Sequence, residues 1–120
     1  MKDFSTHKHS HTLEDGRGVW RVQRLWELAR GLPVEQVAIA DIVEFEQDCW
    51  FGGRAPSCRE VAEHAHRIFE ADLSFPIILS SQGHLMDGGH RIAKAHLAGQ
   101  SHIQAVRFET DPEPDEVREE

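Results

Sequence analysis

The chain has 120 residues, of which 39% are hydrophobic and 28% are charged, a composition typical of a soluble globular protein. Its formal net charge is −8, so it lacks the excess of Lys and Arg with which a bare duplex-DNA binder neutralises phosphates. No apolar run has the length of a membrane span, and the amino-terminal residues lack the apolar core of a signal peptide. We therefore expect a cytoplasmic protein with no membrane partner and with little affinity of its own for DNA.

The amino-terminal residues 1–15 are polar and predict a flexible arm. His7, His9 and His11 alternate there, which is also consistent with a short edge strand whose histidines share one face. Three imidazoles on one face can bind a metal, but metal-binding histidines need supporting contacts that a loose arm does not supply. We therefore give the metal alternative little weight.

From Val19 onwards the pattern predicts an amphipathic helix, in which we also place Trp20. Four apolar residues follow the spacing i, i+3, i+4 and i+7, namely Val22, Leu25, Trp26 and Ala29. Gly31 ends this helix. The next segment, residues 34–39, is short and mostly apolar, and it predicts a strand.

The middle of the chain predicts a loop and a second helix. We expect Asp41 to cap a brief helical turn and residues 44–53 to form a long irregular loop. Ser57 followed by Glu60 is the pattern of a capping box, and it predicts a helix over 57–72. The apolar residues of that helix form one stripe: Val61, Ala62, Ala65, Ile68 and Phe69.

The remaining elements complete the predicted fold. We expect a buried strand, a hairpin turn, a second short strand, a helix and a closing strand over residues 76–80, 81–83, 84–86, 90–97 and 102–108, respectively. Residues 110–120 form an acidic tail that we do not expect to pack. The whole predicts an α/β (α+β) fold, a single compact domain over 16–109 with a small mixed sheet and about three helices.

The segment Asp87-Gly88-Gly89-His90-Arg91 is the candidate functional site. The first N–H groups of a helix have no partner within it and lie at its positive end, so they bind anions. Gly88 and Gly89 let the backbone approach a phosphate, and His90 and Arg91 can donate to it. Asp87 can hold Mg²⁺ or act as a base. The alternative is an ordinary hairpin turn before a helix, and the two interpretations are about equally favoured.

Residues 76–99 resemble the core of the ParB N-terminal/sulfiredoxin superfamily, and with the upstream elements the resemblance covers roughly residues 20–108. Members share a strand, a hairpin, a Gly-rich turn and a helix that binds nucleotide phosphates. The resemblance therefore implies a site for a nucleotide such as ATP, ADP or CTP, accompanied by Mg²⁺, on Gly88, Gly89, His90 and Arg91.

Departures from the family patterns narrow the activity. Sulfiredoxins have a catalytic cysteine just before the His-Arg pair, where this chain has Gly89, so the resemblance does not extend to sulfinic acid reduction. Chromosome-partitioning members have a Gly-Glu-Arg-Arg type box, which this chain lacks. The free-serine kinases have an Asp-Gly-His-His-Arg type box, and Asp87, Gly88, His90 and Arg91 match it best.

The resemblance to those kinases also implies a catalytic glutamate upstream, for which Glu44 and Glu46 are the candidates beside Asp87. Trp50 and Arg54 lie in a glycine-containing loop and can contact a nucleobase or cover a pocket. The alternative is that Trp50 folds back into the core, as large aromatic residues usually do.

Three classes of function remain open at this point. The first is a nucleotide-binding domain with or without turnover, as an Mg²⁺-dependent NTPase or a small-molecule kinase. The second is a non-catalytic regulatory module that binds a protein partner. The third is a DNA-associated protein of the partitioning or nuclease type, which the negative charge disfavours.

Overall fold

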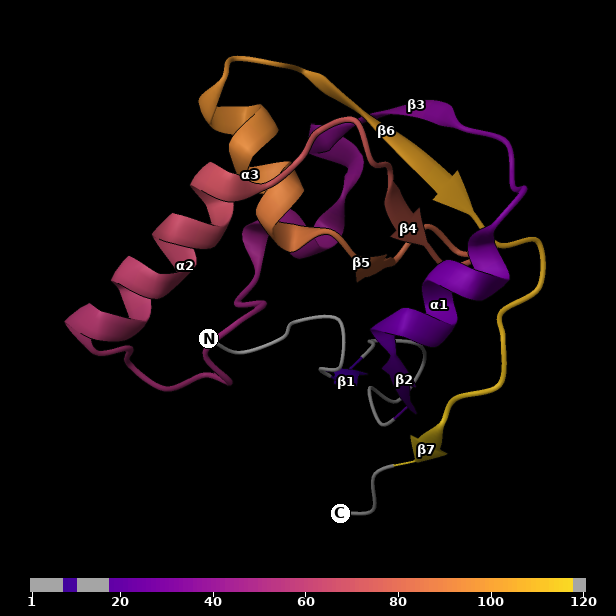
Figure 1. Ribbon diagram of the computed structural model, residues 1–120, viewed down its shortest axis with the longest axis horizontal. Helices are drawn as coiled ribbons and strands as arrows, with labels where there is room; N and C mark the ends of the chain where they lie inside the picture. Colours follow the sequence, from indigo (N-terminus) through magenta and orange to yellow (C-terminus); the bar gives the residue numbers. More distant parts are fainter. Residues whose placement is uncertain (1–7, 11–17, 118–120) are drawn as a thin grey trace.

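The computed structural model describes residues 8–10 and 18–117, which form a mixed α/β fold with two sheets (Figure 1). The predicted fold class is confirmed. In chain order the elements are β1 (Lys8–Ser10), β2 (Gly18–Arg21), α1 (Val22–Ala29), β3 (Glu35–Ala38), the 3-10 helices η2 (Ile39–Asp41) and η3 (Val43–Glu46), α2 (Cys58–Glu70), β4 (Ile77–Leu79), β5 (Leu85–Asp87), α3 (Gly89–Leu97), β6 (His102–Arg107) and β7 (Glu116–Val117).

The larger sheet has four strands in the order β3-β6-β4-β5. β3 runs antiparallel to β6, β6 runs parallel to β4, and β4 pairs antiparallel with β5. All three residues of β4 are buried, because it has a neighbouring strand on each side and helices over both faces. This confirms the prediction of a buried strand followed by a hairpin.

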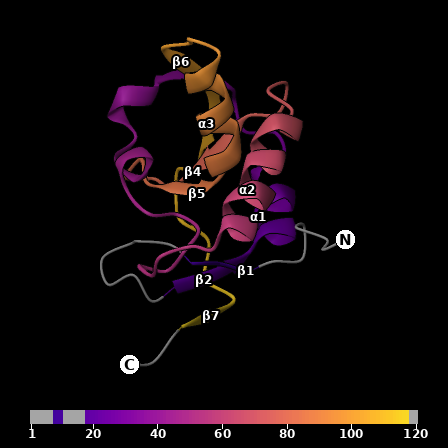
Figure 2. The same cartoon turned by 90° about the vertical axis from the view of Figure 1, so that its left-hand side faces the viewer.

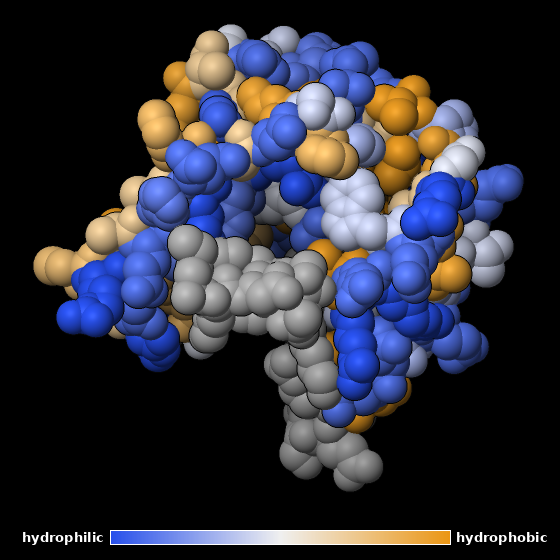
Figure 3. Space-filling model, in the orientation of Figure 1, coloured by the Kyte–Doolittle hydropathy of each residue, from blue (hydrophilic) through white to orange (hydrophobic). Residues whose placement is uncertain are grey.

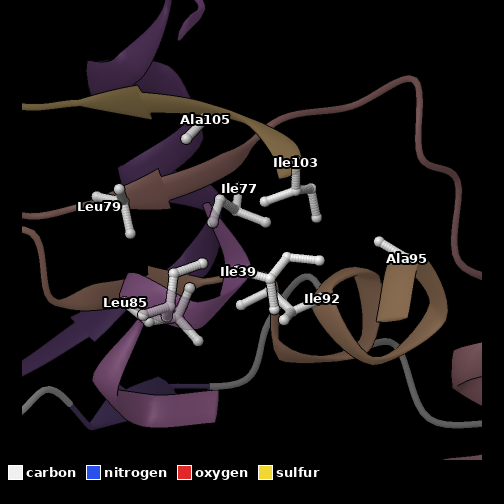
Figure 4. Close-up of a cluster of buried hydrophobic side chains, with 9 residues drawn as sticks. Ile39, Ile77, Leu79, Leu85, Ile92, Ala95, Ile103 and Ala105 are labelled. Carbon is white, nitrogen blue, oxygen red and sulfur yellow. The ribbon is translucent and has the colours of Figure 1, made fainter. Parts of the chain in front are cut away.

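Alternation along the strands gives the four-stranded sheet two apolar faces. Ile77 and Leu79 point to one face, where they pack with Ile92 and Ala95 of α3 (Figure 4). Ile78 points to the other face. There it packs with Met86, Val106, Phe108, Trp20 and two residues of α1, Leu25 and Ala29. The turn between β5 and α3 therefore lies where the chain passes from the sheet to the helix that covers one face.

The first helix is shorter than the sequence predicts, because Gly18–Arg21 forms β2 in a second sheet of order β1-β2-β7. The placement of Trp20 in a helix is therefore wrong. Trp20 is 0% exposed, and its indole Nε1 donates to the carbonyl of Pro112 at 2.9 Å. Arg21 has an extended backbone and precedes the first residue of α1.

The expectation that the acidic tail does not pack is wrong for residues 111–117. Asp111 accepts hydrogen bonds from the backbone N–H and hydroxyl of Ser81, at 2.7 and 3.1 Å. Asp115 accepts from the backbone N–H of Arg21 at 2.7 Å and pairs with Arg24. β7 then pairs with β2. Specific backbone donors stabilise this segment, and its composition alone does not reveal them.

Residues 8–10 form the edge strand β1, in agreement with one of the two predictions for the amino-terminal arm. His9 lies in β1, whereas His7 and His11 lie outside the described residues. Residues 44–46 of the predicted irregular loop belong to η3 (Val43–Glu46), and its cap is Ile42 rather than Asp41.

α2 begins at the predicted capping box, because the Ser57 hydroxyl and the Glu60 carboxylate each accept from the other's backbone N–H. Its last carbonyls accept from Lys94 of α3, whose Nζ lies 2.8 Å from the Phe69 oxygen and 2.7 Å from the Ala71 oxygen. Figure 2 shows α2 and α3 in front of the four-stranded sheet. None of the helices in the described part of the chain is long and apolar enough to span a membrane.

Candidate functional site

The turn from β5 into α3 requires glycine at position 88. Gly88 has φ +125°, and a Cβ there would lie 2.5 Å from Ile77 Cγ2. Since an L residue rarely adopts this conformation and the space is filled, the chain can turn this sharply only with glycine. α3 then starts at Gly89 with no acidic residue in its first turn. The free N–H groups of that turn, with the positive end of the helix dipole, favour an anion.

Arg91 forms a partly buried ion pair with Asp87 on one side of this turn. Its Nη2 lies 3.1 Å from Asp87 Oδ2, and the same oxygen accepts from Trp26 Nε1 at 2.9 Å. The guanidinium carbon also lies 5.3 Å from the centroid of the Trp26 ring, within range of a cation–π interaction. Arg91 Nε is buried, and it has no hydrogen-bond partner in the described part of the chain.

His90 lies on the other side of the turn, in a stack with His64 and Trp50. The His90 and Trp50 rings are nearly parallel, at an angle of 5° with centroids 4.5 Å apart. His64 Nδ1 lies 2.8 Å from His90 Nε2, and Trp50 also stacks on His64. Trp50 thus covers a pair of hydrogen-bonded imidazoles.

Arg67 determines the direction of this hydrogen-bonded chain. Its Nη1 lies 3.4 Å from His64 Nε2, and because a guanidinium can only donate, that nitrogen must accept. A neutral His64 then donates from Nδ1 to His90 Nε2, which leaves the remaining proton of His90 on Nδ1. Burial, followed by the charges of His64 and Arg67, lowers the pKa of His90 to about 4, so His90 is neutral at pH 7.

Asp48 builds the loop that positions Trp50. Its carboxylate accepts from the backbone N–H groups of Trp50, Phe51 and Gly53 at 3.0, 2.7 and 2.7 Å. The bonds from Phe51 and Gly53 are the main reason that the pKa of Asp48 is lowered. Within this loop Trp50 approaches the start of α3, and a Cβ on Gly89 would lie 3.3 Å from the indole Nε1.

A pocket of about 350 Å³ opens beside the start of α3. Gly89 lies in its wall, together with Glu44, Cys49 and Asp48. Its apolar lining comes from Phe45, Trp50, Phe51, Ile68, Leu85 and Ile92. Three aromatic residues in one small pocket suit a planar apolar group. In the space-filling view the surface is also hollowed close to where Figure 1 places the start of α3 (Figure 3).

The structure brings only some of the predicted site residues together. Glu44 is 6% exposed and lines the pocket, but its carboxylate accepts from the Leu85 backbone N–H at 3.0 Å and pairs with His84 at 2.9 Å. Glu46 is exposed and does not line the pocket. Arg54 does not line it either, and instead pairs with Glu60. Trp50, Gly89 and His90 do meet, whereas Asp87 and Arg91 face Trp26.

Sequence reasoning missed His64 and Arg67 as parts of this site. His64 contacts His90, 26 positions further along the chain, and nothing in the local pattern of α2 indicates such a contact. Trp26 has the predicted apolar position in α1, but its bond to Asp87 depends on how α1 crosses the sheet. A search for metal sites found no group of three or more His, Cys, Asp or Glu side chains placed to hold an ion among residues 8–10 and 18–117.

Compared with known proteins, the chain matches no family model, no curated protein and no solved structure.

Proposed function

We propose that the protein binds a nucleotide, with the phosphates at the start of α3 and the base in the adjacent pocket. The observation that carries this proposal is that Gly89 belongs to both, since it opens the helix and lines the pocket of about 350 Å³. A ligand that is anionic at one end and planar and apolar at the other matches this pair of features.

A further observation supports the phosphate end. His90 Nδ1 carries a proton when its Nε2 accepts from His64, so it can donate to a phosphate oxygen. Arg91, whose Nε is buried and whose Nη2 pairs with Asp87 on the Trp26 side of the turn, is not assigned to the phosphate. The resemblance of residues 76–99 to the ParB N-terminal/sulfiredoxin superfamily adds support, because its members bind nucleotide phosphates at the corresponding turn.

Binding without turnover fits the carboxylates better than catalysis does. Both carboxylate oxygens of Glu44 are already bonded, one to the backbone N–H of Leu85 and the other to the His84 ring. Because Trp26 and Arg91 already donate to its Oδ2, Asp87 does not fit a metal site. We therefore assign no Mg²⁺ to this turn and compare titrations with and without the ion. A nucleotide-binding module without turnover belongs to the regulatory class.

The test separates the charge of the ligand from its base. Position 89 can take a side chain without backbone strain, and Gly89→Asp and Gly89→Asn place groups of equal size beside Trp50. The carboxylate of Gly89→Asp repels a phosphate, so we expect ADP to bind at least about tenfold more weakly to Gly89→Asp than to Gly89→Asn, which is about 1.4 kcal/mol. Adenosine should bind the two variants equally.

A second pair of variants tests the pocket. Ala93 lines it, so Ala93→Phe should fill it and weaken both ADP and adenosine, whereas Ala98→Phe, at the exposed end of the same helix, should not. Isothermal titration calorimetry with ATP, ADP and CTP, with and without Mg²⁺, gives these affinities. Equal binding of ADP to Gly89→Asp and Gly89→Asn, or no binding by the unaltered protein, would refute the proposal.

A further inference from the structure

α2 turns most of its apolar stripe away from the rest of the protein, with the exception of Ile68, which lines the pocket beside α3. None of its 13 residues is buried, and Phe69 and Val61 are 76% and 50% exposed. Ala62, Ala65 and Cys58 share that face and are exposed as well. Hydrophobic residues are visible over α2 along the left-hand edge of the molecule in Figure 3.

The opposite, polar flank of α2 contacts the protein instead. His64 bonds to His90 and stacks on Trp50, and Glu60 binds Arg54. Helices in proteins are usually stabilised by packing their apolar face, but here most of that face is left uncovered. The apolar face of α2 is therefore shaped for something outside the described chain.

The charges beside the stripe are placed against the helix dipole. Arg59 lies in the first turn, where an acidic residue is favoured, and Glu70 lies at the last residue, where a basic one is favoured. Both are exposed, and neither has an ion-pair or hydrogen-bond partner among the described residues. Neither charge is favoured by the dipole of α2, whose first turn also contains Glu60 and whose last turn also contains Arg67, and both side chains are available for a contact outside the helix.

We propose that α2 pairs with α2 of a second copy of this chain, antiparallel, to form a homodimer. If the two-fold axis passes between His64 and Ala65, Arg59 faces Glu70 of the second copy. The same register places Glu63 opposite His66 of the second copy. All four residues lie on one flank of the stripe, and in an antiparallel pair like flanks meet.

The side chains on the stripe suit this register. Ala62 and Ala65 lie at its centre, where small residues let two helices approach closely, and Phe69 of each copy lies opposite the Cys58–Val61 end of the other. A helix of 13 residues is about 20 Å long, so this contact is smaller than the roughly 800 Å² per partner of a standard stable interface. The dimer should therefore be weak and reversible. This proposal stands independently of nucleotide binding.

Charge reversal tests the register. In a homodimer Arg59→Glu places a carboxylate opposite Glu70 of the second copy, and Glu70→Arg places a guanidinium opposite Arg59. Each single variant therefore brings like charges together and should weaken dimerisation at least about tenfold. The double variant Arg59→Glu/Glu70→Arg should dimerise like the unaltered protein. An equimolar mixture of the two single variants should form a heterodimer, because one of its pairs joins the two original charges and the other joins the two reversed ones.

Sedimentation velocity over a range of protein concentrations measures these equilibria. Each reversal agrees better with the helix dipole, so circular dichroism melting at low concentration should show unchanged or higher stability, which separates lost pairing from unfolding. Val61→Asp should also abolish the dimer, whereas Val34→Asp, at a valine that is 54% exposed and outside α2, should not. A protein that is monomeric up to about 1 mM, or single variants that fail to associate on mixing, would overturn the proposal.

Discussion

Two consecutive residues of α3, His90 and Arg91, have opposite kinds of surroundings. Arg91 is charged and forms an ion pair with Asp87, and the indole of Trp26 lies against both. His90 is neutral at pH 7, and it bonds to another imidazole beneath the indole of Trp50. Trp26 thus contacts an ion pair, whereas Trp50 stacks on uncharged imidazole rings.

The difference bears on which side of the turn can change. Separating a mostly buried ion pair leaves two uncompensated charges, which is costly, whereas unstacking neutral rings costs on the order of 1 kcal/mol. The Asp87–Arg91 side therefore fixes the turn, and the Trp50–His90 side can rearrange when a ligand reaches Gly89.

The largest effect is expected from Asp87→Ala. It leaves both Arg91 and the Trp26 N–H without their acceptor, so we expect the free energy of unfolding to fall by about 3–4 kcal/mol. Urea denaturation followed by circular dichroism measures this loss. Arg91→Met in the Asp87→Ala background should recover part of it, because the uncompensated charge is removed. A loss below about 1 kcal/mol would show that the pair does not fix the turn.

Gly88→Ala tests the backbone between the two halves. The new Cβ would meet Ile77 Cγ2 at 2.5 Å in a conformation with φ +125°, so we expect a loss of about 2–3 kcal/mol. Gly99→Ala is the matched control, since φ there is +82° and nothing lies within 4 Å of the new Cβ. It should lose only the conformational part, about 1 kcal/mol. If urea denaturation shows the same loss of unfolding free energy for both variants, Ile77 can move away from the new Cβ without a measurable energetic cost.

The sequence predicts the local half of this structure and misses the long-range half. The capping box at Ser57, the buried strand β4 and the glycine turn are all confirmed, because each depends on neighbours within a few residues. The Asp87–Trp26 bond joins residues 61 apart, and the Trp20–Pro112 bond joins residues 92 apart. Periodicity contains no information about such partners.

The same limit explains the error in the tail and the unforeseen hydrogen-bond partner of Glu44. From the sequence alone we expect the carboxylates of Asp111 and Asp115 to be solvated. In the structure they accept hydrogen bonds from the backbone N–H groups of Ser81 and Arg21. The sequence offers Glu44 as the counterpart of a catalytic glutamate and does not show that its carboxylate accepts from the backbone N–H of Leu85. In both cases a polar side chain satisfies a distant backbone donor, and only the fold reveals which one.

The smallest effect is expected from pH on the neutral half. Since the pKa of His90 is about 4 in the folded protein and 6.5 is its ordinary value, the unfolded chain binds more protons between these values. Stability should therefore be constant above pH 6.5 and should fall progressively as the pH drops towards 4. Because His90 is only partly buried, solvent screening reduces this loss to about 1–2 kcal/mol.

His90→Gln should remove most of this dependence, because the amide does not titrate and can still bond to His64. The window from pH 6.5 to 5 is the informative one, since the carboxyl groups of Asp48, Glu60 and Asp115, whose pKa values are lowered, stay charged there. His102→Gln, at an exposed histidine outside the stack, should leave the slope as it is. The residual slope in His90→Gln includes the contribution of His64, whose pKa burial also lowers. If His90→Gln keeps the full slope, the stack is not what holds His90 neutral, and the two halves of the turn differ less than their contacts indicate.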